Sequence, residues 1–402
     1  MRPHSPSGLP RCGTGGLLPR MSPADCRAAP EGALRLTSGR RPINCLEREA
    51  RIRVIGASPP ARGRSRVSRP RLIKESSEAS APLERELLVR IHDLMVKTRV
   101  LEERLIQMYK QGHGYFWIGG PGEEAFNVSL GLLMKKGQGP DFDYLHAHYR
   151  QSGTLLALGE EPIGSLRQMK NTATDPYSGG RNFAGHYSAR KYNVAPVSSP
   201  IEVQYAIAPG TAMVQKRHGG DGITIVTGGD AGTAEGDFAS CLVWSSRPAN
   251  PLPILIIVTN NKWGISTAAE GQHGEQRISD RGKAFGIRSK TINGNDAVEA
   301  YTELREAMAY VRTERKPFLL EANVSRLYGH SSASGANYVS NEVDCLTDFE
   351  AKLEKDGVLT REQMDALRNS YTEEMAAAAR QVRDEPQPDP ESIWKHIYAE
   401  DK

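Results

Sequence analysis

The chain has 402 residues, of which 38% are hydrophobic and 25% charged, so it can form a large core and about two domains by length alone. No apolar run approaches the ~20 residues that a membrane-spanning helix needs, so we expect a soluble protein with no membrane partner. Three of its five cysteines lie within the first 71 residues. A disulfide framework or a cysteine-based metal site is therefore not expected, in keeping with a reducing compartment.

Charge divides the chain into two unequal parts. The first 71 residues carry 15 Arg, no Lys and 4 acidic residues, a local charge of +11. The remaining 37 basic and 44 acidic residues give −7, although the whole chain is +4. Because residues 1–75 are rich in Arg, Ser, Pro, Gly and Ala and poor in apolar periodicity, we expect a disordered leader there. Residues 76–402 then form the folded part, with C-terminal helices from about residue 342.

Two explanations of the leader predict different locations. An Arg-rich, acid-poor segment suits an organellar transit peptide and hence the mitochondrial matrix, whereas a reading frame extended upstream of its true start suits a bacterial cytoplasmic protein, the location we expect. A basic arm would also fit nucleic acid, but no aromatic or motif context accompanies it. We therefore expect no nucleic-acid partner.

Hydrophobic periodicity predicts alternating helices and strands beyond the leader. The predicted helices span residues 83–111, 123–134, 161–170, 201–217, 297–313, 342–354 and 360–383. Apolar runs at residues 223–229, 253–259 and 318–324 predict strands. This alternation is typical of an α/β fold, a parallel sheet with helices on both faces, here followed by a helical C-terminal extension.

Oxygen-bearing side chains follow two of the predicted strands. Asp230 comes directly after the run ITIVTGG, and Asn260 and Asn261 follow PILIIVT. Carboxyl ends of parallel strands meet at one edge of a sheet, where open α/β sheets place their ligands. One carboxylate, one amide and a backbone carbonyl suit Mg²⁺, which takes its other ligands from water and phosphates. The alternative is ordinary turn chemistry at a Gly-Asp and an Asn-Asn pair.

The spacing of Asp230 and Asn261, 31 positions, resembles the thiamine diphosphate motif, in which GDG is followed about thirty residues later by NN. The wider resemblance, from about residue 83 to the C-terminus, is to the α subunit of the first component of 2-oxo acid dehydrogenases. The branched-chain type is the most similar because of Glu235, and the pyruvate and acetoin types are related. The segments that carry it are GPGEEAF (120–126), HAHYRQSG (146–153), VSSPIEVQ (197–204), GDAGTAEGD (229–237), NNKWGIST (260–267), INGND (292–296) and SRLYGHSS (325–332).

This resemblance implies a cofactor site for thiamine diphosphate and magnesium. It implies metal ligation by Asp230, Asn261 and the carbonyl of Trp263, and a catalytic role for His330. The implied cofactor-binding residues are His148, Tyr149, Arg150, Ser199, Ile201, Gly229, Asp230, Ala231, Gly232, Asn261 and His330. Two of them depart from the family: His148 replaces a common Gln, and Ala231 replaces the usual Gly after the acid, which would be strained if that position requires a positive φ.

The resemblance also implies partners. The glutamate that activates the cofactor belongs to a separate β subunit in this family, so we expect an α2β2 heterotetramer that hands its acyl group to a lipoylated acyltransferase component. Phe116, Trp117 and Glu124 are candidate channel-lining residues. Three alternatives remain open: a pyruvate or acetoin enzyme, a non-catalytic scaffold subunit of the same fold, and a magnesium-dependent phosphohydrolase, which would require a P-loop or an acidic cluster that the sequence lacks.

Overall fold

The computed structural model describes residues 82–339, 341–395, 397 and 398, so the predicted leader lies outside the described residues. Its centre is a parallel sheet with the strand order β1-β2-β3-β7-β6. The strands are β1 (Tyr144–His146), β2 (Thr224–Gly229), β3 (Ile254–Asn260), β7 (Phe318–Asn323) and β6 (Arg288–Asn293). The predicted α/β class with a parallel sheet is confirmed.

The central strands form because their side chains are apolar on both faces. Every residue of β2 and β3 is buried, as expected for strands covered by helices on both sides. The edge strands differ: β6 alternates exposed and half-buried residues along much of its length, and β1 has only three residues. Apolar runs do not mark these two edge strands, and neither was predicted from the sequence.

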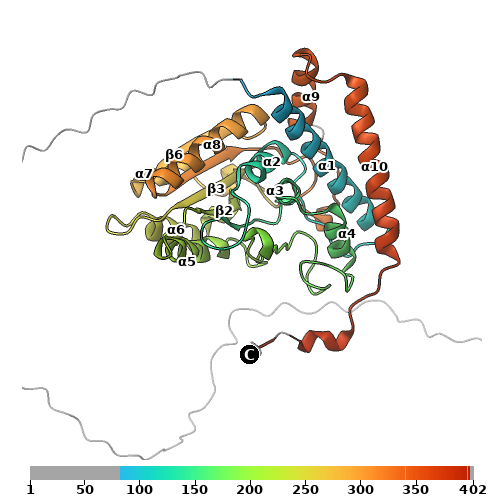
Figure 1. The fold of residues 1–402 in the computed structure, drawn as a ribbon, viewed down its shortest axis with the longest axis horizontal. Helices are drawn as coiled ribbons and strands as arrows, with labels where there is room; N and C mark the ends of the chain where they lie inside the picture. The colour runs from blue at the N-terminus through green and yellow to red at the C-terminus, as the bar shows by residue number, and fades with distance from the viewer. Residues whose placement is uncertain (1–81, 340, 396, 399–402) are drawn as a thin grey trace, which may run out of the picture. The chain divides into compact units, whose positions relative to one another are not determined.

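Helices cover both faces of the sheet (Figure 1). On one face, α5 (Val203–Arg217) and α6 (Gly236–Ser245) contact each other and pack Tyr205 and Phe238 onto the sheet. On the other face lie α2 (Glu124–Leu133), α3 (Ser152–Leu158) and α8 (Ala297–Glu314), which share an apolar cluster with the strands. This arrangement leaves the carboxyl ends of the strands to the connecting loops.

A helical group packs beside this sandwich. The long α1 (Arg85–Lys110) lies along α10 (Arg361–Arg383) and contacts α9 (Cys345–Lys355) and α4 (Pro162–Lys170), as Figure 1 shows for α1 and α10. Thr360 forms a capping box with Gln363 at the start of α10. The predicted C-terminal helical extension is therefore confirmed. No described helix is long and apolar enough to cross a membrane.

All predicted helix boundaries except the start of α9 agree with the structure to within two residues, and the shifts at α5 and α9 have local causes. α5 begins at Val203 instead of residue 201, because Glu202 has a left-handed backbone with φ 66°. α9 begins at Cys345 because Asp344 caps it by accepting bonds from the backbone N–H groups of Leu346 and Thr347. The remaining short elements are β4 (Trp263–Gly264), β5 (Thr267–Ala268), α7 (Arg281–Ala284) and the 3-10 turns Arg190–Tyr192, Ala231–Ala234, Ala269–Gly271, Ile278–Asp280, Ser332–Ser334 and Pro390–Trp394.

Candidate cofactor site

A cavity of about 310 Å³ lies at the carboxyl ends of the sheet, where loops after β1, β2 and β3 converge. Most of the predicted site residues line it, although they come from segments far apart in the sequence. They are His148, Tyr149, Arg150, Ile201, Gly229, Asp230, Ala231, Gly232, Trp263 and His330. Two predicted residues, Ser199 and Asn261, do not line the cavity. The Ser199 hydroxyl instead hydrogen-bonds Nε2 of His186 at 2.7 Å.

Asp230 supplies a buried carboxylate at the end of β2. Gly229 pairs with Thr259 in the parallel register of β2 and β3, which places the next residues, Asp230 and Asn260, at neighbouring strand ends. The Asp230 side chain is almost fully buried, and its Oδ2 has no hydrogen-bond partner among the described residues. Burial raises the pKa of Asp230 above its ordinary value, and the guanidinium of Arg150 opposes that rise. A cation is the ligand that such an unpaired carboxylate would favour.

The two asparagines after β3 have different environments. Asn260 donates from Nδ2 to Oε1 of Glu321 at 2.8 Å, which is a structural bond within the sheet. Asn261 accepts a bond on Oδ1 from the backbone N–H of Trp263 at 3.1 Å, while its Nδ2 has no partner in the described chain. Lys262, which lies between Asn261 and Trp263, has φ 64°, so the chain turns sharply here. Asn261 and Trp263 are thus held together by the turn.

The turn after Asp230 explains the departure at Ala231. Ala231 starts a 3-10 turn and is not among the described non-glycine residues with positive φ, so its methyl group causes no backbone strain. The essential glycine is the next one, because a Cβ at Gly232 would collide with the side chain of Glu202. The condition under which Ala231 would be strained, a positive φ, is therefore not met, and the close approach lies at Gly232.

Arg150 and Tyr149 form a cationic wall of the cavity. The Arg150 side chain is buried, and its Nη2 donates to the Tyr149 hydroxyl at 3.2 Å. Its Nε and Nη1 have no hydrogen-bond partner in the described chain. A buried guanidinium with free N–H groups is suited to a phosphate, which accepts several charge-assisted hydrogen bonds.

Two histidines complete the wall, and both are uncharged at neutral pH. Burial, with Arg150 and Arg326 adding to it, lowers the pKa of His330 to about 4, and its Nδ1 has no partner among the described residues. His330 meets the Tyr149 ring edge-on at 6.0 Å between centroids. Burial also holds the pKa of His148 well below its ordinary range, and neither ring nitrogen of His148 is paired in the described chain.

Sequence reasoning missed two buried acids at this site. Glu202 lines the cavity and accepts a bond from the Gly229 N–H at 3.3 Å, and burial raises its pKa to about 8. Glu123 is fully buried, and its Oε1 lies 3.5 Å from Nη1 of Arg150. The only sequence signal for Glu202 was its place within the segment VSSPIEVQ (197–204). Glu123 stood beside Glu124, and nothing in the pattern separated their roles.

Three suggested channel-lining residues lie elsewhere. Trp117 is buried and donates from Nε1 to Glu102 at 2.9 Å. Glu124 is buried in an ion pair with Arg99, 2.6 Å between Oε1 and Nε. Phe116 packs against Phe183. None of the three lines the cavity, so this expectation is corrected.

The donor set fits a diphosphate with a divalent cation better than a metal alone. No group of three or more His, Cys, Asp or Glu that could hold a metal occurs among the described residues. The cavity region instead holds unpaired polar atoms of both signs, on Asp230, Asn261, Arg150, His148 and His330. Because buried polar groups in proteins are almost always paired, this concentration indicates a polar ligand. The residues present thus fit thiamine diphosphate and magnesium.

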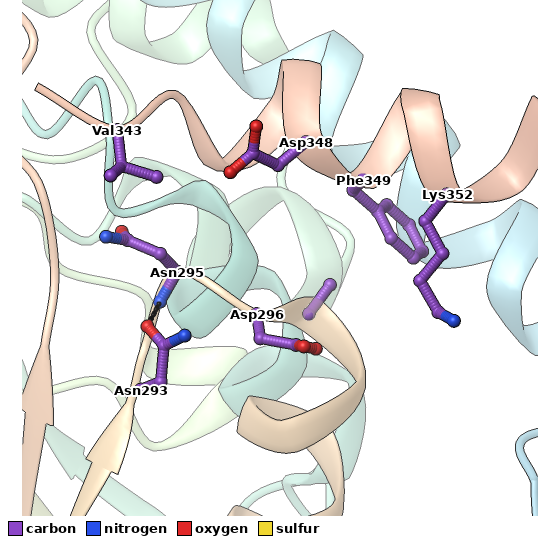
Figure 2. Close-up of a pocket in the computed structure, with 8 residues that line it drawn as sticks. Asn293, Asn295, Asp296, Val343, Asp348, Phe349 and Lys352 are labelled. Atoms are coloured by element: carbon purple, nitrogen blue, oxygen red, sulfur yellow. Dashed lines mark hydrogen bonds between the residues drawn. The ribbon is translucent and has the colours of Figure 1, made fainter.

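A second cavity of about 300 Å³ lies between the start of α8 and α9 and is shown in Figure 2. Its amides are paired among themselves: the Asn295 backbone N–H donates to Oδ1 of Asn293 at 3.1 Å, and Asp296 caps α8. Asn295 also donates from Nδ2 to the Ser325 hydroxyl. Since none of its lining residues has an unpaired buried polar atom, this cavity lacks the signature of the first one.

Comparison with known proteins agrees with this geometry. Residues 92–391 match the family model described as "Dehydrogenase E1 component". The chain is 29% identical over 323 residues to the 2-oxoisovalerate dehydrogenase subunit alpha of Bacillus subtilis, covering 77% of this chain and 95% of that protein. It is 25% identical over 338 residues to the mitochondrial human subunit alpha, covering 82% of this chain and 74% of that protein. The chain therefore belongs to the dehydrogenase E1 component family, whose fold binds thiamine diphosphate.

Proposed function

We propose that this chain is the α subunit of a branched-chain 2-oxo acid dehydrogenase, which decarboxylates a 2-oxo acid oxidatively and passes the acyl group to a lipoyl carrier. The names of the bacterial and human relatives support the substrate class. The observation that carries the proposal is the cavity itself, because it brings ten predicted residues together around unpaired buried polar atoms.

The chain's residues divide the binding of the cofactor among them. Asp230, Asn261 and the Trp263 carbonyl would hold Mg²⁺, with the diphosphate completing the shell. Tyr149 and Arg150 would donate to the phosphate oxygens, and the backbone of the turn Ala231–Ala234 would face them. Thiamine diphosphate, when bound, supplies a carbon nucleophile that adds to the ketone and accepts the electrons released with carbon dioxide.

His330 is the candidate catalytic residue of this chain. It lines the cavity, and its imidazole is neutral at pH 7 because burial lowers its pKa to about 4. Its unpaired Nδ1 is available to the substrate as a hydrogen-bond partner. A neutral imidazole can accept or donate a hydrogen bond without placing a second positive charge beside Arg150.

A partner subunit is supported by an uncharged face on α5 and α6. Residues 203–215 and 238–246 contain no Asp, Glu, Lys or Arg. Four large apolar side chains on these helices are about half exposed: Ile207 (53%), Val214 (51%), Val243 (48%) and Trp244 (48%). Ile201 and Ile265 extend exposed apolar surface to the cavity mouth. A surface of this kind marks a protein interface, and we assign it to the β subunit that would complete the cavity.

Co-expression with a β subunit and a lipoylated acyltransferase domain tests the proposal. Turnover would be compared on 2-oxoisovalerate, pyruvate and acetoin, and we expect the highest kcat/KM for 2-oxoisovalerate. A preference for pyruvate or acetoin would instead identify the chain as the α subunit of the corresponding dehydrogenase. Inactivity on all three with thiamine diphosphate bound would support a non-catalytic subunit instead.

A further inference from the structure

Glu123 and Glu124 are consecutive, yet their side chains serve different parts of the molecule. The Glu124 carboxylate is fully engaged, because it accepts bonds from Arg99, from the Gly122 N–H at 2.8 Å and from the Cys345 thiol. The Glu123 carboxylate is also completely buried, but neither of its oxygens has a hydrogen-bond partner among the described residues. The surroundings of Glu123 therefore need a separate explanation.

Two unpaired donors lie beside Glu123. Its Oε1 is 3.5 Å from Nη1 of Arg150, slightly long for a buried ion pair. Burial raises the pKa of Glu123 to about 7, and the Arg150 guanidinium and the Asn261 amide both oppose the rise. Nη1 of Arg150 and Nδ2 of Asn261 are themselves without partners in the described chain. One carboxylate with two free oxygens thus faces two donors that each lack an acceptor.

The first turn of α2 already fixes the backbone of Arg150. Asn127 donates from Nδ2 to the Arg150 carbonyl at 2.9 Å, and its Oδ1 accepts from Gln151. Glu123 is the N-cap of α2 and accepts the Asn127 N–H on its backbone carbonyl at 3.0 Å, so the two residues lie on the same side of the helix start. This side can fix the main chain of Arg150 through Asn127 and its side chain through Glu123.

We propose that Glu123 is a positioning residue that orients both Arg150 and Asn261 for the cofactor, an inference that rests on the proposed function. One carboxylate oxygen holds the Arg150 guanidinium toward the diphosphate. The other holds Nδ2 of Asn261, which leaves the amide oxygen for the metal and the Trp263 N–H. A single side chain thereby couples the phosphate ligand to the metal ligand, as the hydrogen-bond partners of metal ligands do in other proteins.

The substitution Glu123→Gln tests this role with little change of shape. A glutamine can accept from only one of the two donors and places its own NH2 group against the other. We expect the Kd for thiamine diphosphate, and the Kd for Mn²⁺ measured at saturating thiamine diphosphate, each to rise about 10- to 100-fold. Both would be measured by titration calorimetry on the full chain with its partner subunit. Glu123→Asp, which keeps two acceptor oxygens, should restore part of both affinities.

Glu102→Gln is the matched control. Glu102 is equally buried, and burial raises its pKa to about 7 as well, but it bonds Trp117 and Ser152 instead of cavity residues. We expect its two Kd values to stay within about threefold of wild type, and the Tm of the cofactor-free Glu123→Gln protein to match wild type. Equal Kd values for Glu123→Gln and wild type would overturn the inference, as would equal losses in both variants. Failure of wild type to bind thiamine diphosphate would instead refute the proposed function.

Discussion

Charged side chains are buried both at the cavity and beside α1, but the two regions differ in how completely those side chains are hydrogen-bonded. On the α1 side, Arg99 is bonded to the carboxylates of Glu124 and Asp344, the latter through two bonds of 2.9 and 3.0 Å. At the cavity, Asp230 and Arg150 keep unpaired atoms. Removing one partner of a fully paired buried charge leaves the other charge uncompensated, whereas a buried charge that has no partners costs stability until a ligand arrives. Substitutions beside α1 should therefore reduce stability, and substitutions at the cavity should reduce cofactor binding.

The largest expected effect is on binding, at Asp230. Asp230→Ala removes the carboxylate ligand, so the Kd for thiamine diphosphate in Mg²⁺ should rise more than about 100-fold, beyond the loss typical of outer partners. The cofactor-free protein should be as stable as wild type or more so, because an unpaired buried charge is removed. Calorimetric titration and thermal unfolding measure the two quantities. Asp237→Ala, in the same segment but not lining the cavity, should bind normally.

Arg99→Met should show the opposite pattern. Removing the guanidinium leaves Glu124 and Asp344 without their cation, which should lower the free energy of unfolding by about 3–5 kcal/mol in chemical denaturation. The Kd for the cofactor should change less than about threefold in protein that remains folded. Arg90→Met is the control: its side chain is 55% exposed, and exposed ion pairs contribute about 0–1 kcal/mol. Equal losses in both variants would remove the distinction between the regions.

Val243→Asp tests the apolar face that we assign to the β subunit. A charge within this uncharged face should prevent co-purification of the partner while leaving the monomer folded, as judged by circular dichroism. Val343→Asp introduces the same change at a valine of similar exposure, 50% against 48%, outside that face. If both variants retained the partner, the interface would lie elsewhere.

Glu202→Gln should change the pH dependence of stability in the cofactor-free protein. Burial raises the folded-state pKa of Glu202 to about 8 from the ordinary 4.5, so the folded state binds more protons than the unfolded state between these values. Wild-type stability contributed by this group must therefore fall as the pH rises from 4.5 to 8. We expect the Tm of Glu202→Gln, relative to wild type, to increase from pH 5 to pH 8. If the Tm difference between the two proteins were the same at pH 5 and pH 8, the raised pKa of Glu202 would be contradicted.

The smallest effect is expected for Ala231→Gly, which restores the usual residue of the family motif. Because the residue is not among those with positive φ, the Kd for the cofactor should change by less than about twofold, and stability should fall slightly, by about 0.5–1 kcal/mol, through the added chain entropy. A tenfold gain in affinity would show that Ala231 strains the turn.

The sequence allowed the frame of this site to be predicted because its strands are distinctive. β2 and β3 are apolar runs ending at Asp230 and at the asparagine pair, and their parallel pairing follows from that pattern. The order of β7 and β6, and the edge strand β6 itself, could not be predicted. β6 contains polar residues such as Arg288 and Lys290 and is largely exposed, so it has no apolar run that would indicate a strand.

The acids of the site were harder to predict than its frame. Glu123 and Glu202 act through burial and through neighbours distant in sequence, such as Arg150 and Gly229. Neither property leaves a periodic signal, since a buried glutamate at a helix start looks like an ordinary first-turn acid. Only the packed structure separates Glu123 from Glu124.

Titration of thiamine diphosphate into the full chain with its partner subunit, with and without Mg²⁺, tests the cofactor site most directly. We predict saturable binding of one cofactor per copy of this chain, lost when the metal is removed. No saturable binding, or binding indifferent to both Mg²⁺ and Asp230→Ala, would contradict a cofactor held at the carboxyl edge of β2 and β3.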